Sequence, residues 1–138
     1  GSEDVMDLHG NLQQVVCQSC QYREAFAEAR SRAEAGECPP ECPECGRPLK
    51  PDGILFGEQL PKHALYRAHA LSERSDVFVV AGSSLTVEPA ASLPETAVDH
   101  GATLAIVNFD QTPHDDRAEY TFRSDVTTVL PKLAEAVL

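Results

Sequence analysis

The sequence predicts an α/β fold, part of a doubly wound parallel sheet with a small cysteine-bearing module inserted into it. Two observations support this fold class. After Leu60, segments with helical spacing alternate with continuous apolar runs, an order that is typical of parallel βαβ units. Between residues 11 and 50 the chain is polar and carries all five of its cysteines. This part is therefore expected to form a separate module.

The first 53 residues predict few regular elements. Residues 4–9 (DVMDLH) are expected to form the end of a short strand that runs into a turn at Gly10. A helix is expected over 22–34, because helix formers dominate there and Gly36 follows as a stop signal. The stretch 36–53 is dense in Pro, Cys and Gly, which predicts a knuckled loop.

The rest of the chain predicts alternating helices and strands. A helix is expected over 60–75, where apolar residues recur at helical spacing: Leu60, Ala64, Leu65, Ala68 and Leu71. The other expected elements are buried strands over 77–85 and 103–110, a short strand over 120–125, and helices over 89–101 and 126–138. Pro131 fits the last helix only if it lies in the first turn.

Composition excludes several classes of protein. The chain has 138 residues and a net charge of -11, with 22 acidic and 11 basic residues. Direct nucleic-acid binding needs a basic surface, so it is not expected. No run approaches the roughly 18 apolar residues of a membrane span, and no signal peptide opens the chain. A cytoplasmic protein is therefore expected.

Four cysteines have the spacing of a metal site. Cys17-x-x-Cys20 is followed after 21 residues by Cys42-x-x-Cys45, and two such pairs can place four thiolates at the corners of a tetrahedron. The preferred interpretation is one structural zinc ion bound by these thiolates. Iron or a redox dithiol are the alternatives. Cys38 could replace Cys42 or Cys45, but it is more simply a free thiol on a loop. Four thiolates close the site, so His9 needs another explanation.

Five motifs in series resemble the C-terminal part of the sirtuins, a family of NAD-dependent protein-lysine deacylases. They cover nearly the whole chain and are L-H-G-N (8–11), C-x-x-C with C-P-x-C-G (17–46), R-P-L-K-P-D-G-I-L-F-G-E-Q-L-P (47–61), G-S-S-L-T-V-E-P-A (82–90) and I-V-N (106–108). The resemblance implies an enzyme that transfers an acyl group from lysine to ADP-ribose and releases nicotinamide. It also implies that the zinc is structural.

The resemblance assigns the catalytic base and the peptide site. His9 corresponds to the histidine that takes a proton from a ribose hydroxyl of NAD, a role that suits a side chain titrating near neutral pH. Without the resemblance, His9 is more simply an ordinary turn histidine. The acyl-lysine peptide would add as a strand along the loop, with Ile54 and Phe56 beside the acyl-lysine tunnel. The implied substrate-binding residues are Ile54, Leu55, Phe56, Gly57 and Glu58.

The resemblance also assigns the cofactor site. Gly82, Ser83 and Ser84 follow a strand and would contact the ribose and phosphates of NAD, as turns at the carboxyl ends of parallel strands often do. Asn108 would reach the adenine-side ribose, with Asp110 nearby and Val126 beside adenine. Considered alone, the two serines are more simply a helix cap or a turn.

The resemblance implies two domains and a missing part. Residues 1–10 and 51–138 would belong to a Rossmann-like NAD-binding domain, and 11–50 would form the inserted zinc-ribbon module. The Gly-Ala-Gly-x-Ser and Gln-Asn-x-Asp motifs of the sirtuin N-terminal half do not occur in this sequence. We therefore expect the missing half of the same enzyme as a partner, and little activity or NAD binding from this chain alone. The alternative is a non-catalytic zinc module that binds an acylated peptide or partner protein.

Overall fold

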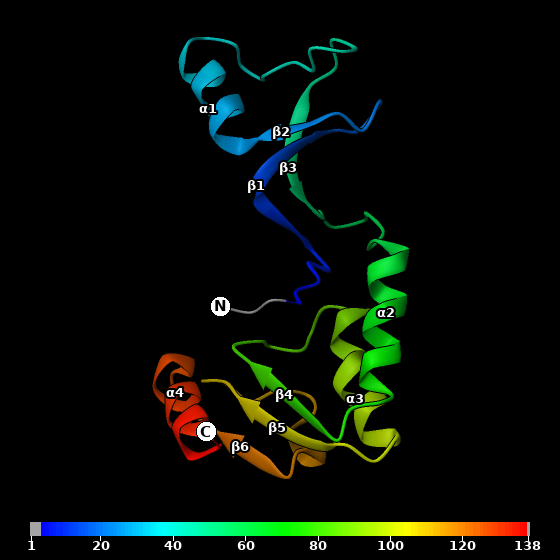
Figure 1. The fold of residues 1–138 in the computed structure, drawn as a ribbon, viewed down its shortest axis with the longest axis vertical. Helices are drawn as coiled ribbons and strands as arrows, with labels where there is room; N and C mark the ends of the chain where they lie inside the picture. Colours follow the sequence, from blue (N-terminus) through cyan, green and yellow to red (C-terminus); the bar gives the residue numbers. More distant parts are fainter. Residues whose placement is uncertain (1–3, 138) are drawn as a thin grey trace. The chain divides into compact units, whose positions relative to one another are not determined.

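The computed structural model describes residues 4–137, which form two compact units. The first unit is Gly1–Lys62 and the second is His63–Leu138 (Figure 1). Each unit has its own sheet and its own small core. The domain boundaries expected from the sequence stay a prediction.

The first unit is built on a three-stranded antiparallel sheet in the order β2-β1-β3. Its strands are β1 (Gly10–Cys17), β2 (Arg23–Ala25) and β3 (Leu49–Gly53). The expected strand over 4–9 is wrong, because the N–H of Gly10 donates to the carbonyl of Asp7 at 3.1 Å and closes a turn there. The strand therefore begins where that turn ends, at Gly10.

The helix of the first unit is shorter than the sequence predicts. Helix α1 (Phe26–Glu34) ends as expected, at Ala35 and Gly36, and Gly36 has a φ of +107°. Its expected first turn is instead strand β2, in which Arg23 pairs with Val16 of β1. Pairing with β1 overrides the helix propensity of this segment, which is a weak preference.

The expected loop over 36–53 is a loop only as far as Pro48, and the rest of it is strand β3. Pro51 lies within β3, opposite Val15 of β1. Because β3 is an edge strand, the missing N–H of a proline is tolerated there. The loop predicted from the density of Pro and Gly is therefore too long, because its last residues form β3.

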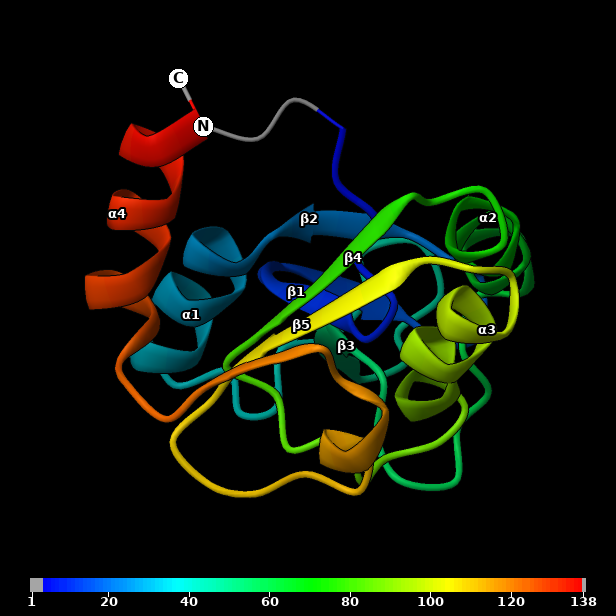
Figure 2. The same ribbon diagram turned by 90° about the horizontal axis from the view of Figure 1, so that it is seen from below.

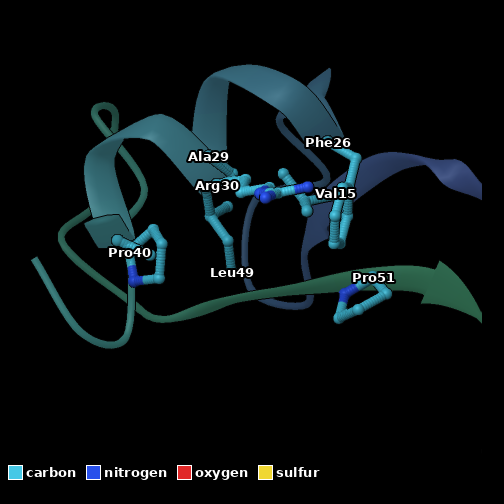
Figure 3. Close-up of a pocket in the computed structure, with 8 residues that line it drawn as sticks. Val15, Phe26, Ala29, Arg30, Pro40, Leu49 and Pro51 are labelled. Carbon is cyan, nitrogen blue, oxygen red and sulfur yellow. The ribbon is translucent and has the colours of Figure 1, made fainter. Parts of the chain in front are cut away.

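The apolar core of the first unit is small. It consists of Val15, Cys17, Ala29, Cys42 and Leu49, with Tyr22 packed against it. An open apolar hollow of about 220 Å³ lies between α1 and the sheet, with Phe26 and Arg30 along its helix side (Figure 3). Since two of the five core residues are cysteines, apolar packing alone holds this unit weakly.

The second unit has the expected α/β order. Its elements are α2 (Lys62–Ser72), β4 (Val77–Ala81), the 3₁₀ turn η1 (Ala90–Ser92), α3 (Leu93–Asp99), β5 (Thr103–Val107), the 3₁₀ turn η2 (Asp115–Arg117), β6 (Tyr120–Phe122) and α4 (Val126–Val137). The strands form a parallel sheet in the order β4-β5-β6. Figures 1 and 2 show α2 and α3 on one side of the sheet and α4 on the other. The predicted parallel βαβ arrangement is confirmed.

The core of the second unit is centred on β5. Leu104, Ile106 and Val107 of this strand are fully buried, and Val80 of β4 and Leu85 belong to the same region. The strand lies between β4 and β6, so both of its edges are paired. The sequence prediction of a buried strand is confirmed for β5.

Strand β4 is buried on one face only, contrary to the expectation. Val80 is buried, whereas Val77 and Val79 are exposed on the other face. Val77 and Val79 alternate with Val80 along the strand, so their exposure means that one face of the sheet is uncovered at β4. β4 is also an edge strand of this sheet. The edge presents unpaired backbone groups beside exposed valines, an arrangement that favours pairing with another chain.

Helix α4 contains Pro131 in its interior, so the expectation that this proline lies in the first turn is wrong. Pro131 has no N–H to donate to the carbonyl of Thr127, which weakens the helix at this point. None of the described α4 residues is buried, so water can satisfy that carbonyl. The expected end of the helix, Leu138, lies outside the described residues. Within residues 4–137, no helix is long and apolar enough to cross a membrane.

We expect the exposed face of β4 to make the chain self-associate. Val79→Lys should reduce association, because a lysine on an edge strand disfavours pairing with a second edge. Sedimentation velocity over a range of concentrations measures the effect. Val87→Lys is the matched control, since Val79 and Val87 are equally exposed (47%) and Val87 lies outside the strands. Equal effects of the two variants would contradict the prediction.

Candidate active site and metal centre

Four cysteine thiols meet in the first unit. The Sγ atoms of Cys17, Cys20, Cys42 and Cys45 all lie within 4.8 Å of one another. Those of Cys17 and Cys45 are 3.4 Å apart, and those of Cys20 and Cys42 are 3.5 Å apart. A zinc ion bound to four thiolates at about 2.3 Å needs sulfur–sulfur distances of about 3.8 Å, so small shifts complete the tetrahedron.

The two Cys-x-x-Cys turns have the same backbone geometry. The N–H of Gln21 donates to the carbonyl of Cys17 at 2.9 Å, and the N–H of Gly46 donates to that of Cys42 at 2.8 Å. Gln21 and Gly46 both have a positive φ, at 64° and 69°. Each turn thus curls around its own pair of sulfurs. The two turns face each other as the halves of one site.

The four thiols of this site differ in pKa. Hydrogen bonding from the amide of Cys20, opposed by burial and supported by the amide of Ser19, lowers the pKa of the Cys17 thiol to about 6. The amide of Tyr22 acts in the same direction on Cys20, but burial and the neighbouring thiols outweigh it and raise the pKa of Cys20 to about 12; the pKa of Cys45 is raised as well. Since metal ligation requires thiolates, Cys17 is the thiol best prepared for it, and binding of a metal ion must displace the protons of its neighbours. Cys38 is exposed and lies outside the cluster. The residues predicted from their spacing therefore fit one structural zinc ion.

Cys42→Ser should abolish metal binding and unfold the first unit, because it removes one ligand and part of the core. Metal content by mass spectrometry and the circular dichroism of the purified chain measure both effects. Cys38→Ser is the matched control, which should retain one zinc ion per chain. Loss of metal from the Cys38 variant, or its retention by the Cys42 variant, would contradict this ligand set.

His9 lies in the turn that precedes β1, and its side chain is exposed. Its ring is therefore accessible to a bound molecule. Its backbone carbonyl accepts the N–H of Ile54 at 2.9 Å, and the adjacent Gly10 pairs with Gly53. The structure therefore brings the predicted base beside the start of the predicted peptide loop.

Gly10 permits this close approach. A Cβ at this position would lie 1.9 Å from the carbonyl oxygen of Asp52, and φ is +69°. No other residue type fits both the space and the backbone conformation. The glycine of the His-Gly pair therefore sets the position of His9 relative to β3.

The predicted substrate residues form a single tight turn. The N–H of Glu58 donates to the carbonyl of Leu55 at 2.9 Å, and Gly57 has the positive φ (+90°) that the third residue of a type II turn requires. Leu55 (61%) and Phe56 (98%) are strongly exposed at its tip, and Ile54 is half-buried. Large exposed apolar residues on one turn mark a surface that binds other molecules.

Two residues that the sequence analysis did not single out contact this turn. Lys50 and Gln18 both hydrogen-bond to the carboxylate of Glu58. Lys50 comes from β3 and Gln18 from the first cysteine turn. Both lie inside motifs quoted from the sequence, but no pattern marks them as partners of Glu58. Only the register of β1 against β3 brings the three residues together.

The predicted cofactor residues lie in the second unit, at the carboxyl ends of its strands. The N–H of Gly82 donates to the carbonyl of Val107 at 2.9 Å, and that of Asn108 donates to the carbonyl of Phe122 at 3.1 Å. Val126 begins α4, and its Cγ1 lies 3.7 Å from the position a Cβ on Gly82 would occupy. Gly82, Asn108 and Val126 therefore share one edge of the sheet, where α/β proteins bind ligands.

The remaining predicted cofactor residues make local contacts at that edge. Ser83 Oγ accepts the N–H of Leu85 at 3.3 Å, and the hydroxyls of Ser84 and Thr86 are 2.9 Å apart. These bonds are those of a turn, as the simpler interpretation of the two serines predicts. The side-chain amide of Asn108 donates to the carbonyl of Asp110 at 3.0 Å, which fixes its orientation.

The structure defines an α/β protein that carries a cysteine metal module. Its parallel sheet has polar turns at the carboxyl edge. Comparison with known families identifies it further. The Sir2 family matches residues 1–89, and the chain belongs to this family. The resemblance to sirtuins that the motifs indicated is thereby confirmed.

Related proteins agree with this assignment. The chain is 43% identical over 136 residues to the NAD-dependent protein deacetylase of Haloarcula marismortui, and 44% identical over 135 residues to NAD-dependent protein deacetylase 1 of Pyrobaculum aerophilum. Each match covers 98% of this chain and 52% of the relative. The chain thus spans about half the length of the curated relatives it matches.

Solved structures give the same result. A Sir2 complex with a p53 peptide and NAD+ matches with a TM-score of 0.92 at 37% identity, covering 99% of this chain and 56% of that chain. Sir2Tm bound to a propionylated peptide matches with a TM-score of 0.92, also at 37% identity, and the match covers 57% of that chain. The fold of the chain is therefore that of the corresponding part of Sir2.

Gly10→Ala should destabilise the first unit by at least about 2 kcal/mol, because the new Cβ collides with the Asp52 carbonyl and φ is unfavourable. Urea unfolding of the zinc-loaded chain measures the change. Gly53→Ala is the matched control on the partner strand, where the added Cβ would lie 3.8 Å from the His9 carbonyl oxygen, an ordinary contact. Equal stability of the Gly10 variant and the unsubstituted chain would show that the close approach is not required.

Proposed function

We propose that this chain is the zinc-bearing portion of an NAD-dependent protein-lysine deacylase. The enzyme transfers the acyl group to ADP-ribose and releases nicotinamide. Relatives named as protein deacetylases support the activity, and Sir2 complexes with acylated peptides support the substrate class. The turn at 54–58 is called the peptide turn below. The observation that carries the proposal is the backbone hydrogen bond between His9 and Ile54, which joins the base to the peptide turn.

In this mechanism His9 acts as the general base. Its ring is exposed, and a neutral imidazole nitrogen can accept a proton from a hydroxyl. The peptide lies along the turn at 54–58, where backbone pairing holds it whatever its sequence. Ile54 and Phe56 lie beside the acyl-lysine, and the exposed ring of Phe56 is free to contact its apolar part. Both parts of the site lie in the first unit.

NAD, when bound, supplies the electrophilic ribose carbon that accepts the acyl oxygen. The residues that would hold it are Gly82, Ser83, Ser84, Asn108, Asp110 and Val126. Their position at the carboxyl edge of a parallel sheet fits a dinucleotide. Gly82 also fits, because a positive φ (+63°) and the absence of a side chain allow a ligand to approach the backbone. Cys17, Cys20, Cys42 and Cys45 would hold zinc and keep the fold without taking part in the reaction.

The proposal extends to domains, partner and compartment. Residues 1–10 and 51–138 belong to a Rossmann-like NAD-binding domain, with 11–50 as its zinc module. The partner is the half of the enzyme that corresponds to the uncovered part of the relatives. Four cysteines held as thiols suit the reducing cytoplasm, where we place the protein.

The second candidate is a non-catalytic module that binds an acylated peptide. It is favoured by the turn at 54–58, which lies within the first unit and exposes Leu55 and Phe56. Peptide binding uses the turn at 54–58, which is present. Turnover needs a complete cofactor site. Nicotinamide release therefore separates the two candidates.

His9→Ala should lower turnover by about 10²–10⁴-fold, the usual contribution of a general base. The assay uses a chimera in which this chain replaces the matching half of the Haloarcula marismortui deacetylase, and it measures nicotinamide released from NAD with an acetyl-lysine peptide. Zinc content should stay unchanged. His63→Ala, also at an exposed position, is the control and should keep the rate of the parent chimera.

Two results would contradict the proposal. Undiminished turnover by the His9 variant would remove its role as the base. The other result has two parts. If neither the chimera nor this chain alone releases nicotinamide, and this chain nevertheless binds the acetyl-lysine peptide, the non-catalytic module is supported instead.

A further inference from the structure

The carboxylate of Glu58 joins three segments of the first unit. Its Oε1 accepts a hydrogen bond from Gln18 Nε2 at 2.8 Å. Its Oε2 accepts the backbone N–H of Leu55 at 2.9 Å and lies 3.2 Å from Lys50 Nζ. Gln18 lies between the metal ligands Cys17 and Cys20. The carboxylate therefore connects a cysteine turn, strand β3 and the peptide turn.

Lys50 also contacts the end of β3, just before this turn. Its Nζ donates to the carbonyl of Gly53 at 2.6 Å and lies 3.3 Å from that of Pro51. The ammonium group thus holds the last residues of β3 as well as the carboxylate of Glu58. The side chains of Lys50 and Glu58 are only 21% and 29% exposed, so solvent screens the pair less than a surface salt bridge.

This network decides which backbone groups of the turn are available to a peptide. The N–H of Ile54 is bound to His9, that of Leu55 is bound to Glu58, and the carbonyl of Leu55 accepts the N–H of Glu58. The N–H groups of Phe56 and Gly57 have no partner among the described residues. Within this turn, a peptide that adds as a strand therefore finds unpaired N–H donors at Phe56 and Gly57.

We propose that Glu58, held by Gln18 and Lys50, is a positioning residue that fixes the peptide turn and ties it to the metal module. This inference rests on the proposed function of the turn as the peptide site. Glu58 does not touch the reacting atoms. It acts by holding the Leu55 amide inward, so that the backbone of Phe56 and Gly57 faces the peptide.

The charge state of Glu58 is consistent with this role. The N–H of Leu55 and the Lys50 ammonium lower the pKa of the Glu58 carboxyl below its ordinary value. The carboxylate is therefore ionised at neutral pH and accepts all three hydrogen bonds. A glutamine in its place offers one oxygen in place of two, so it cannot accept the same set.

Hydrogen exchange of the zinc-loaded chain tests the positioning role. Glu58→Gln should make the Leu55 amide exchange at least about tenfold faster, because it removes a charge-assisted bond to that amide. Gln18→Met and Lys50→Met should each raise the same rate, and Lys50→Arg should restore part of the protection. The amides of the β1–β3 ladder and the zinc content should stay unchanged.

A double variant and a matched control complete the exchange experiment. In the double variant Gln18→Met with Glu58→Gln, the Leu55 amide should exchange no faster than in Glu58→Gln alone. Both substitutions act through the same carboxylate, so their effects should not add. Glu28→Gln makes the same change at an exposed residue of α1 and should have no effect. An unchanged Leu55 rate, or equal acceleration across the whole unit, would overturn the inference.

Peptide affinity separates this inference from the proposed function. The dissociation constant of a fluorescent acetyl-lysine peptide should rise at least about tenfold in the Glu58→Gln chain, in parallel with the loss of protection. Unchanged affinity despite faster Leu55 exchange would overturn the positioning role alone. Failure of the unsubstituted chain to bind the peptide would instead overturn the proposed peptide site itself.

Discussion

The cluster of four cysteine thiols is the interaction on which the first unit depends. Its apolar core has five buried residues, and two of them, Cys17 and Cys42, belong to the cluster. So small a core cannot offset the conformational entropy of about 60 ordered residues. A zinc ion supplies the missing free energy, because metal binding to thiolates that are assembled only in the folded state is itself folding free energy. The metal is therefore structural for a physical reason that needs no appeal to the family.

The metal also determines where the candidate active site lies, although it is not part of that site. Strand β1 runs from Gly10, beside His9, to the ligand Cys17. Strand β3 begins at Leu49, just after Cys45, and ends at Gly53, where the peptide turn starts. The two strands pair with each other, so both connect the cluster at one end to His9 and Ile54 at the other. Fixing the cysteines thus fixes the proposed base and the proposed peptide turn together.

The second unit places its candidate cofactor residues by a different rule. In a parallel sheet all strands end at the same edge, so turns that follow β4 and β5 must lie side by side. Gly82 and Asn108 meet there through hydrogen bonds to the ends of neighbouring strands. The same sheet leaves β4 with one unpaired edge. A chain that spans about half of its relatives is expected to leave such an edge, because a doubly wound sheet normally continues on both sides of its buried strands.

The sequence predicted what short-range patterns encode. Apolar runs predicted β5, and the spacing of the cysteines predicted the cluster of four thiols, because both signals are local. The residues 23–25 were misassigned because pairing with β1 outweighed their helix propensity, and 49–53 because an edge strand accepts Pro51. The contact between Gln18 and Glu58 joins residues 40 positions apart, and no short-range pattern links the two motifs that contain them. It exists only because the register of β1 on β3 brings the first cysteine turn beside the peptide turn. A positioning network of this kind is therefore visible only in the folded chain.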